Sequence, residues 1–129
     1  MRKGQVMYRM RSERGAAAVE FALVLPVLLL ILLGIIEFGR AYNVQISLTH
    51  AARETARTMA IDNVWGDAVS QGRTAAPSVA LVAGDFAAAP AACAQGQQIS
   101  VTVTHELETL TGITDGLTLT GKAAMRCGG

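Results

Sequence analysis

An apolar run from Ala16 to Ile36 constrains this chain of 129 residues more than any other feature. Glu20 is the one charged residue in the run, and Val, Leu and Ile dominate the remainder. Counted to Glu37, the run has about 22 residues, or about 33 Å as an α-helix, which is enough to cross a bilayer. The sequence therefore predicts a membrane-spanning helix over residues 16–37.

Basic residues precede the apolar run. The first 14 residues carry five Lys or Arg side chains against one acidic residue, although the net charge of the chain is only +1. A basic flank is typical of the cytoplasmic end of a membrane helix. We therefore expect residues 1–15 to be a basic leader on the cytoplasmic side and the residues beyond Arg40 to be exported. No aromatic platform or basic groove accompanies these charges, so nucleic acid is not an expected partner.

A cleavable secretory signal fits this N-terminus poorly. Such a signal has an apolar core of about 7–15 residues followed by a site of the A-x-A type. The apolar run here is longer, and the residues that follow it, EFGRAY, offer no good site. An uncleaved anchor stays open as an alternative.

A helical pattern continues past the apolar run. Small apolar residues recur there every three or four positions, and polar residues take the other faces. The apolar positions are Ala41, Val44, Leu48, Ala52, Ala56, Met59 and Ala60. Residues 16–62 are therefore predicted to form one long helix. Its apolar stripe either packs on the chain's own C-terminal domain or partly on neighbouring subunits, and both interpretations stay open.

Residues 63–129 are predicted to form a small exported domain. Apolar and polar residues alternate over residues 99–107 and 117–126, which indicates two strands. The turn signal Asp115-Gly116 precedes the second of them, so we expect an antiparallel pair. Together with the long helix, these strands place the chain in the α+β class.

Three weaker elements are expected in the same domain. They are a short helix over residues 67–73, a third short strand over residues 78–82, and a loop over residues 84–98, which are rich in small residues.

Cys93 and Cys127 both fall in the exported part, where an oxidising compartment permits a disulfide. Export and the even cysteine count predict that the two are paired, and two unpaired buried thiols are the alternative. The bond would close a loop of about 34 residues and stabilise a thin core. The cysteines lack the CxxC spacing of redox sites, so a stabilising role is expected.

The sequence holds no motif for catalysis or for a cofactor. His50 and His105 lie far apart, and no Cys, His or Asp cluster has metal-ligand spacing. GxSxG, Walker-type and dinucleotide-binding patterns do not occur. We therefore expect no enzymatic activity, no metal or cofactor and no small-molecule substrate.

Glu20 requires an explanation, because a carboxylate is disfavoured in hydrocarbon. One interpretation is that it reaches the inner headgroups or leans toward Arg14. Another is that the chain is cut between Gly15 and Ala16, which would place a positive amine four residues from Glu20. The amine could belong to the same subunit or to a neighbour. A charge with one allowed partner specifies alignment more than it stabilises, so Glu20 would then set the register of assembly.

Gly15, followed by an apolar segment with Glu20 at its fifth position, resembles the class III signal of type IV pilin-like proteins. Over residues 12–60 the motifs RGAAAVEFAL, LPVLLLILLGIIEFGR and THAARETAR closely resemble the TadE-like (TadE/TadG) pseudopilins of tight-adherence, or Flp, type IVb pilus systems. The chain is longer than the major Flp pilins, and it has Glu-Phe at residues 20–21 where they often carry Glu-Tyr. The resemblance therefore implies a minor pseudopilin rather than the main subunit.

The resemblance also implies a processing step and a set of partners. A prepilin peptidase would cut after Gly15, leaving Ala16 as the new N-terminus and a candidate for N-methylation. Ala16 stands where many type IV pilins have Phe. The partners would be the membrane, the peptidase, other pilins or pseudopilins and the inner-membrane assembly proteins. The chain would lie in the inner membrane with its N-terminus in the cytoplasm and its C-terminus outside, or in the extracellular pilus.

Two other functions compete with this interpretation. The first is an uncleaved membrane-anchored module whose exported domain binds a ligand outside the cell. The second is an extracellular enzyme with a helical anchor, which the missing catalytic constellation disfavours.

Overall fold

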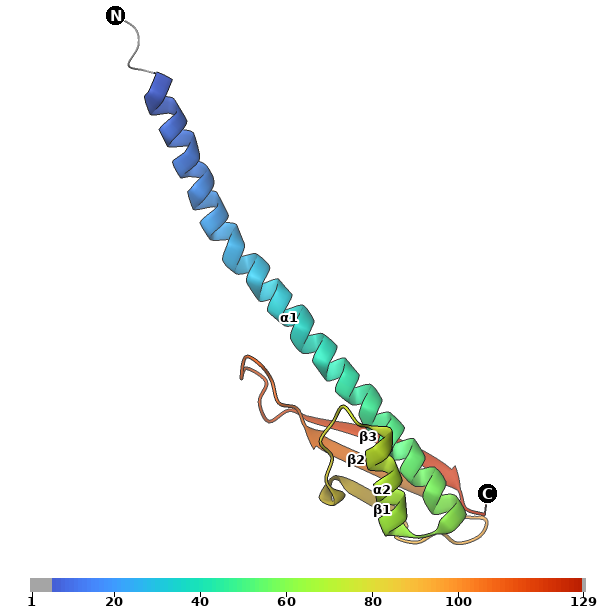
Figure 1. Cartoon of the computed structure of the whole chain (residues 1–129). Helices are drawn as coiled ribbons and strands as arrows, with labels where there is room; N and C mark the ends of the chain where they lie inside the picture. The colour runs from blue at the N-terminus through green and yellow to red at the C-terminus, as the bar shows by residue number, and fades with distance from the viewer. Residues whose placement is uncertain (1–5, 129) are drawn as a thin grey trace, which may run out of the picture. The chain divides into compact units, whose positions relative to one another are not determined.

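The structure is a computed structural model that describes residues 6–128, with the side chains of residues 13–128. Its elements follow in the order α1 (Val6–Asp62), α2 (Trp65–Ala75), the 3-10 helix η1 (Ala83–Asp85), β1 (Phe86–Ala89), β2 (Gln98–Glu106) and β3 (Thr118–Arg126) (Figure 1). This content confirms the predicted α+β class. Of the basic leader, Arg2 and Lys3 lie outside the described residues, as do the side chains of Arg9 and Arg11.

Helix α1 begins at Val6, well before the start predicted at residue 16. The stretch from residue 6 to residue 14 contains no Gly or Pro, and Gly15 weakens a helix by only about 1 kcal/mol relative to Ala. Nothing in the local sequence therefore ends the helix at the predicted boundary. Part of α1 is long and apolar enough to cross a membrane, and none of its most apolar 18-residue window is buried.

The boundary between two compact units falls between Phe38 and Gly39. The first unit contains the apolar part of α1, whose side chains from residue 13 to residue 36 are all exposed. The second unit contains the rest of α1 together with α2 and the three strands. The amphipathic part of the long helix therefore belongs to the same unit as the sheet.

The sheet has the strand order β1-β2-β3, and both pairs are antiparallel. Val103 in the central strand lies opposite Phe86 of β1 and Gly121 of β3. The predicted antiparallel pair is therefore confirmed.

The third strand was predicted in the wrong place. Residues 78–82 form no strand, and the backbone N–H of Val79 donates to Ala76 O at 3.2 Å in a turn. Strand β1 lies instead in the segment expected to be a loop. Its sequence, FAAA, has little strand propensity of its own, so pairing with β2 decides its conformation.

Two glycines allow the helices to approach the sheet. A Cβ at Gly121 would lie 2.7 Å from Thr49 N, so α1 lies against β3 in backbone contact. A Cβ at Gly72 of α2 would lie 3.0 Å from Ala51 O of α1 and 2.8 Å from Phe86 Cε1 of β1. Helices α1 and α2 therefore contact each other and cover the same face of the sheet.

The core lies between these two layers. The larger buried cluster joins α1, α2, the 76–81 segment and the strands, and consists of Leu48, Ala51, Ala52, Ala56, Val69, Ala76, Val79, Leu81, Phe86, Val101 and Val103. A smaller cluster consists of Met59, Ala68, Ile99 and Cys127. Four residues of the predicted apolar stripe, Leu48, Ala52, Ala56 and Met59, are buried here. The stripe therefore packs on the chain's own C-terminal unit.

Candidate processing and assembly site

The residues predicted to be processed lie inside α1, with Gly15 and Ala16 in unbroken helix. A Cβ at Gly15 would have nothing within 4 Å, so there is room for a side chain at this position. Glu20 lies four residues beyond Ala16. In an α-helix this spacing places both residues on one face, about 6 Å apart along the axis.

The Glu20 carboxylate lies on an apolar surface. Val19 and Phe21 beside it are exposed, and so are all side chains from there to Ile36. Among the described side chains, no Lys, Arg or His lies within 4.0 Å of Glu20. The helix therefore presents a single acidic group on an otherwise apolar surface, and that group can form an ion pair with a cation brought to it.

The two cysteines are joined in a disulfide, with their Cα atoms 5.6 Å apart. Cys127 is buried in the smaller cluster and lies directly after β3, while Cys93 belongs to the connection between β1 and β2. The backbone N–H of Cys127 also donates to Gln97 O at 2.8 Å. The bond therefore ties the end of the sheet to the connection that precedes β2.

Asn63, which was not among the predicted site residues, holds the same connection to the end of α1. Its amide group bonds the backbone of Cys93 twice: Oδ1 accepts from the N–H at 2.8 Å, and Nδ2 donates to the carbonyl oxygen at 3.2 Å. Its own backbone is left-handed, with φ 53°, and its N–H donates to Met59 O at 3.1 Å. An Asn directly after a helical pattern is the signal that could have predicted this cap.

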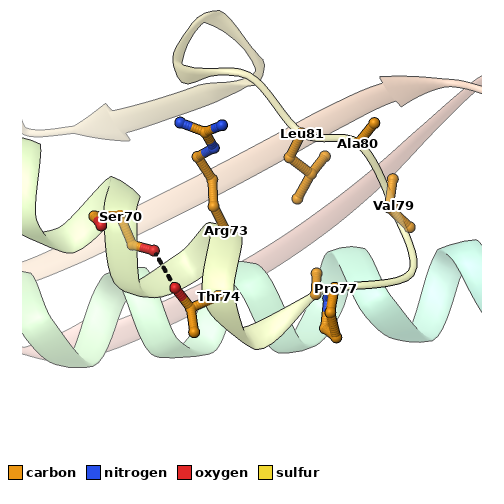
Figure 2. Close-up of a pocket in the computed structure, with 8 residues that line it drawn as sticks. Ser70, Arg73, Thr74, Pro77, Val79, Ala80 and Leu81 are labelled. Carbon is orange, nitrogen blue, oxygen red and sulfur yellow. Dashed lines mark hydrogen bonds between the residues drawn. The ribbon is translucent and has the colours of Figure 1, made fainter.

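A shallow pocket of about 330 Å³ lies between α2 and the 76–81 segment. Figure 2 shows Ser70, Arg73 and Thr74 on the helix side and the chain from Pro77 to Leu81 on the other. Thr74 Oγ1 donates to Ser70 O at 3.0 Å, so this hydroxyl is engaged within its own helix. The pocket offers one cation and small polar groups, and no carboxylate or histidine lines it.

A second hollow, of about 690 Å³, lies where β2 leads into the following loop. His105 and Asp85 line it, with His105 Nδ1 3.8 Å from Asp85 Oδ2. His105 is half-buried. Within residues 13–128 no three His, Cys, Asp or Glu side chains are placed to hold a metal ion.

These features define a class of protein. An N-terminal apolar helix suited to anchoring in a membrane leads into a small α+β unit that is closed by a disulfide. Residues 15–57 match the family model of TadE-like proteins, which confirms the resemblance over those residues. The match begins at Gly15 and ends within α1, so it covers the helix and not the sheet.

No curated protein and no solved structure matched the chain.

Proposed function

We propose that this chain is a minor pseudopilin, a structural component of a type IVb (Tad/Flp) pilus or secretion machine, and that a prepilin peptidase cuts it after Gly15. Three observations support the proposal. The TadE-like match begins at Gly15, the apolar segment follows directly, and the only charge in that segment is Glu20.

Glu20 is the observation that supports the proposal most strongly. In the uncut chain the nearest preceding cation in the sequence is Arg14, six residues or about 9 Å along the helix. A cut after Gly15 would create an amine at Ala16, only one helical turn away and on the same face. When such helices pack side by side, the carboxylate of one subunit could pair with the amine of the next. Between packed helices, a Glu20 carboxylate without a partner would be a buried, unpaired charge, which is strongly destabilising. Only the register that pairs each carboxylate with an amine would therefore be stable.

The position of the junction inside a helix bears on how it would be cut. A peptidase needs an extended backbone at the scissile bond, so the helix must open around residue 15. Gly at this position weakens the helix by about 1 kcal/mol relative to Ala and places no side chain in the way.

The decisive experiment is to determine the N-terminus of the protein by mass spectrometry, from membranes and from sheared surface material of a host that contains the peptidase. We expect it to begin at Ala16. Gly15→Ala should block processing, whereas Gly34→Ala should be processed normally. Gly34 is a matched control, because it is also a glycine within α1, and a Cβ there would likewise have nothing within 4 Å. A wild-type protein that keeps residues 1–15 in this host would contradict the proposal and leave an uncleaved membrane anchor.

Glu20→Gln separates assembly from processing. This substitution keeps the size of the side chain and removes its charge. We expect normal membrane insertion and cleavage but about tenfold less protein in the sheared fraction, because the aligning ion pair is lost. An uncleaved binding module should be indifferent to this change or should insert better.

A further inference from the structure

The loop between β2 and β3, residues 107–117, carries the most exposed large apolar side chain of the described residues. Ile113 is 84% exposed, and Leu110 in the same loop is 64% exposed. The stretch from residue 110 to residue 114, LTGIT, contains no charge. Exposed apolar side chains that gather in one place mark protein or membrane contact sites, and these two lie three residues apart in one loop.

The loop is held in shape by its own polar groups. Thr109 Oγ1 donates to Asp115 Oδ1 at 2.6 Å, and the N–H of Gly112 donates to Thr109 Oγ1 at 3.0 Å. At its base, the N–H of Leu107 donates to Leu117 O at 2.8 Å. These hydrogen bonds close the turn, and the polar groups that form them are satisfied within the loop. The loop therefore presents an uncharged tip with two exposed apolar side chains.

The register of α1 on β3 shows where this tip lies within the C-terminal unit. Gln45 Nε2 donates to Thr120 O at 2.8 Å, and the N–H of Gly128 donates to Ala60 O at 3.2 Å. Between these contacts α1 advances about 23 Å, and β3 with the two residues after it advances about 26 Å, so α1 and β3 run side by side in the same direction. Thr118 then lies about level with residue 41, and the loop continues beyond the end of the sheet (Figure 1). The tip is therefore at the Gly39 end of the unit.

The Gly39 end is where the apolar segment joins. Phe38 directly precedes it, and the segment predicted to span the membrane, residues 16–37, ends just before Phe38. Arg40 and the exposed Tyr42 follow, and these residue types favour the headgroup level of a membrane. The chain therefore passes into the apolar segment at the same end of the unit that carries Leu110 and Ile113.

We propose that the 107–117 loop is a second membrane contact, whose tip inserts Leu110 and Ile113 into the headgroup region of the bilayer that α1 spans. The partner is a lipid surface. Because the tip is uncharged and Glu108 and Asp115 lie behind it, the contact should form on zwitterionic lipid and gain nothing from anionic lipid. The inference rests on the membrane-anchoring part of the proposed function and not on cleavage after Gly15.

The test uses the full chain in phosphatidylcholine nanodiscs at one copy per disc. A nitrobenzoxadiazole fluorophore is attached to one added cysteine, at Ile113→Cys, Ile61→Cys or Leu29→Cys, with the native disulfide kept and verified by mass. Ile61 is the matched control, because it is an isoleucine with 63% exposure at the opposite end of the unit, beside Ala60. Leu29 reports insertion of α1. We expect nitroxide-labelled lipid to quench the label at residue 113 about threefold more than the label at residue 61.

Each outcome decides the proposal. Strong quenching at residues 29 and 113 but not at residue 61 supports it. Quenching at residue 29 alone overturns the loop contact and leaves the anchor intact. No quenching at residue 29 removes the anchor and the loop contact together. If the label at residue 113 is shielded only when several copies share a vesicle, and lipid does not quench it, a second copy covers the loop and the proposal is wrong.

Discussion

At the scale of single residues, Asn63 does two things at the end of α1. Its left-handed backbone turns the chain out of the helix, and its side chain holds the connection that carries Cys93. Asn is among the few residues other than Gly that adopt this conformation readily. The residue therefore couples the end of the helix to the disulfide.

Replacing Asn63 separates these two roles. Asn63→Ala should lower the free energy of unfolding by about 2 kcal/mol, because it loses the side-chain hydrogen bonds and strains the left-handed backbone. Asn63→Gly should cost about 1 kcal/mol, since only the hydrogen bonds are lost. Denaturant titration in micelles, followed by the fluorescence of Trp65, measures both. Equal losses in the two variants would show that the backbone conformation contributes nothing.

At the scale of elements, the contact between α1 and β3 depends on Gly121. The position facing Leu48 and Thr49 has no room for a Cβ, and the atoms that a Cβ would meet belong to the helix backbone. Backbone atoms cannot rotate away as a flexible side chain can. The sequence Thr-Gly-Lys within a strand is therefore a packing requirement rather than a weakness of the strand.

Gly121→Ala should push α1 away from the sheet. We expect a loss of about 1–3 kcal/mol in the free energy of unfolding, the usual cost of overpacking a close contact. Gly66→Ala in α2 is the control, because a Cβ there meets nothing within 4 Å. It should leave stability unchanged or raise it slightly, since Ala favours a helix. If both variants unfold at the same denaturant concentration, the helix and the sheet are not in the close contact described above.

At the scale of the whole molecule, the C-terminal unit is small and its core is made largely of Ala and Val. A core of this size contributes little net stability, and a covalent bond that restricts the unfolded chain offsets this. The Cys93–Cys127 bond spans 34 residues. Cys127 also packs against Met59 and Ile99, so it contributes apolar contact in addition to the bond.

Reduction of the disulfide should therefore lower the free energy of unfolding by about 3–4 kcal/mol. Cys127→Ser should cost more than Cys93→Ser, because it also places a hydroxyl in the buried cluster. Denaturant titration with and without reductant checks both expectations. The double variant should not respond to reductant, and a wild-type protein equally stable in both conditions would contradict a stabilising role for the bond.

Much of the fold could be predicted because periodicity reports burial directly. The three-to-four-residue spacing of Leu48, Ala52 and Ala56 predicted the packed face of α1, and the alternation of Ile99, Val101 and Val103 predicted β2. Val79 and Leu81 alternate in the same way and are buried, yet they lie in a turn segment packed in the core. Alternation shows which side chains are inside, but it does not show whether the backbone has a strand partner.

Some residues of the candidate site could also be predicted from the sequence, and others could not. The prediction at Gly15, Ala16 and Glu20 came from the linear order of residues along one helix, so no tertiary contact was needed to make it. It stays a prediction until the N-terminus is measured. The pairing of Cys93 with Cys127 was inferred from their number and compartment, and the structure joins them. The hydrogen bonds of Asn63 to Cys93 and the placement of the 107–117 loop were missed, because both depend on contacts between distant segments.

The sequence by itself determined the properties that follow from local order: an apolar segment long enough to span a bilayer, one charge within it, a helix that continues beyond it, and two alternating strands. Only the tertiary structure decided the properties that depend on close approach. It placed an Ala-rich segment in the sheet, required glycine where α1 and α2 meet their neighbours, and carried Ile113 to the end of the unit where the apolar segment joins. The physical reason is that hydrophobic periodicity depends only on the order of neighbouring residues. Strand register and close contacts depend on how distant segments pack together.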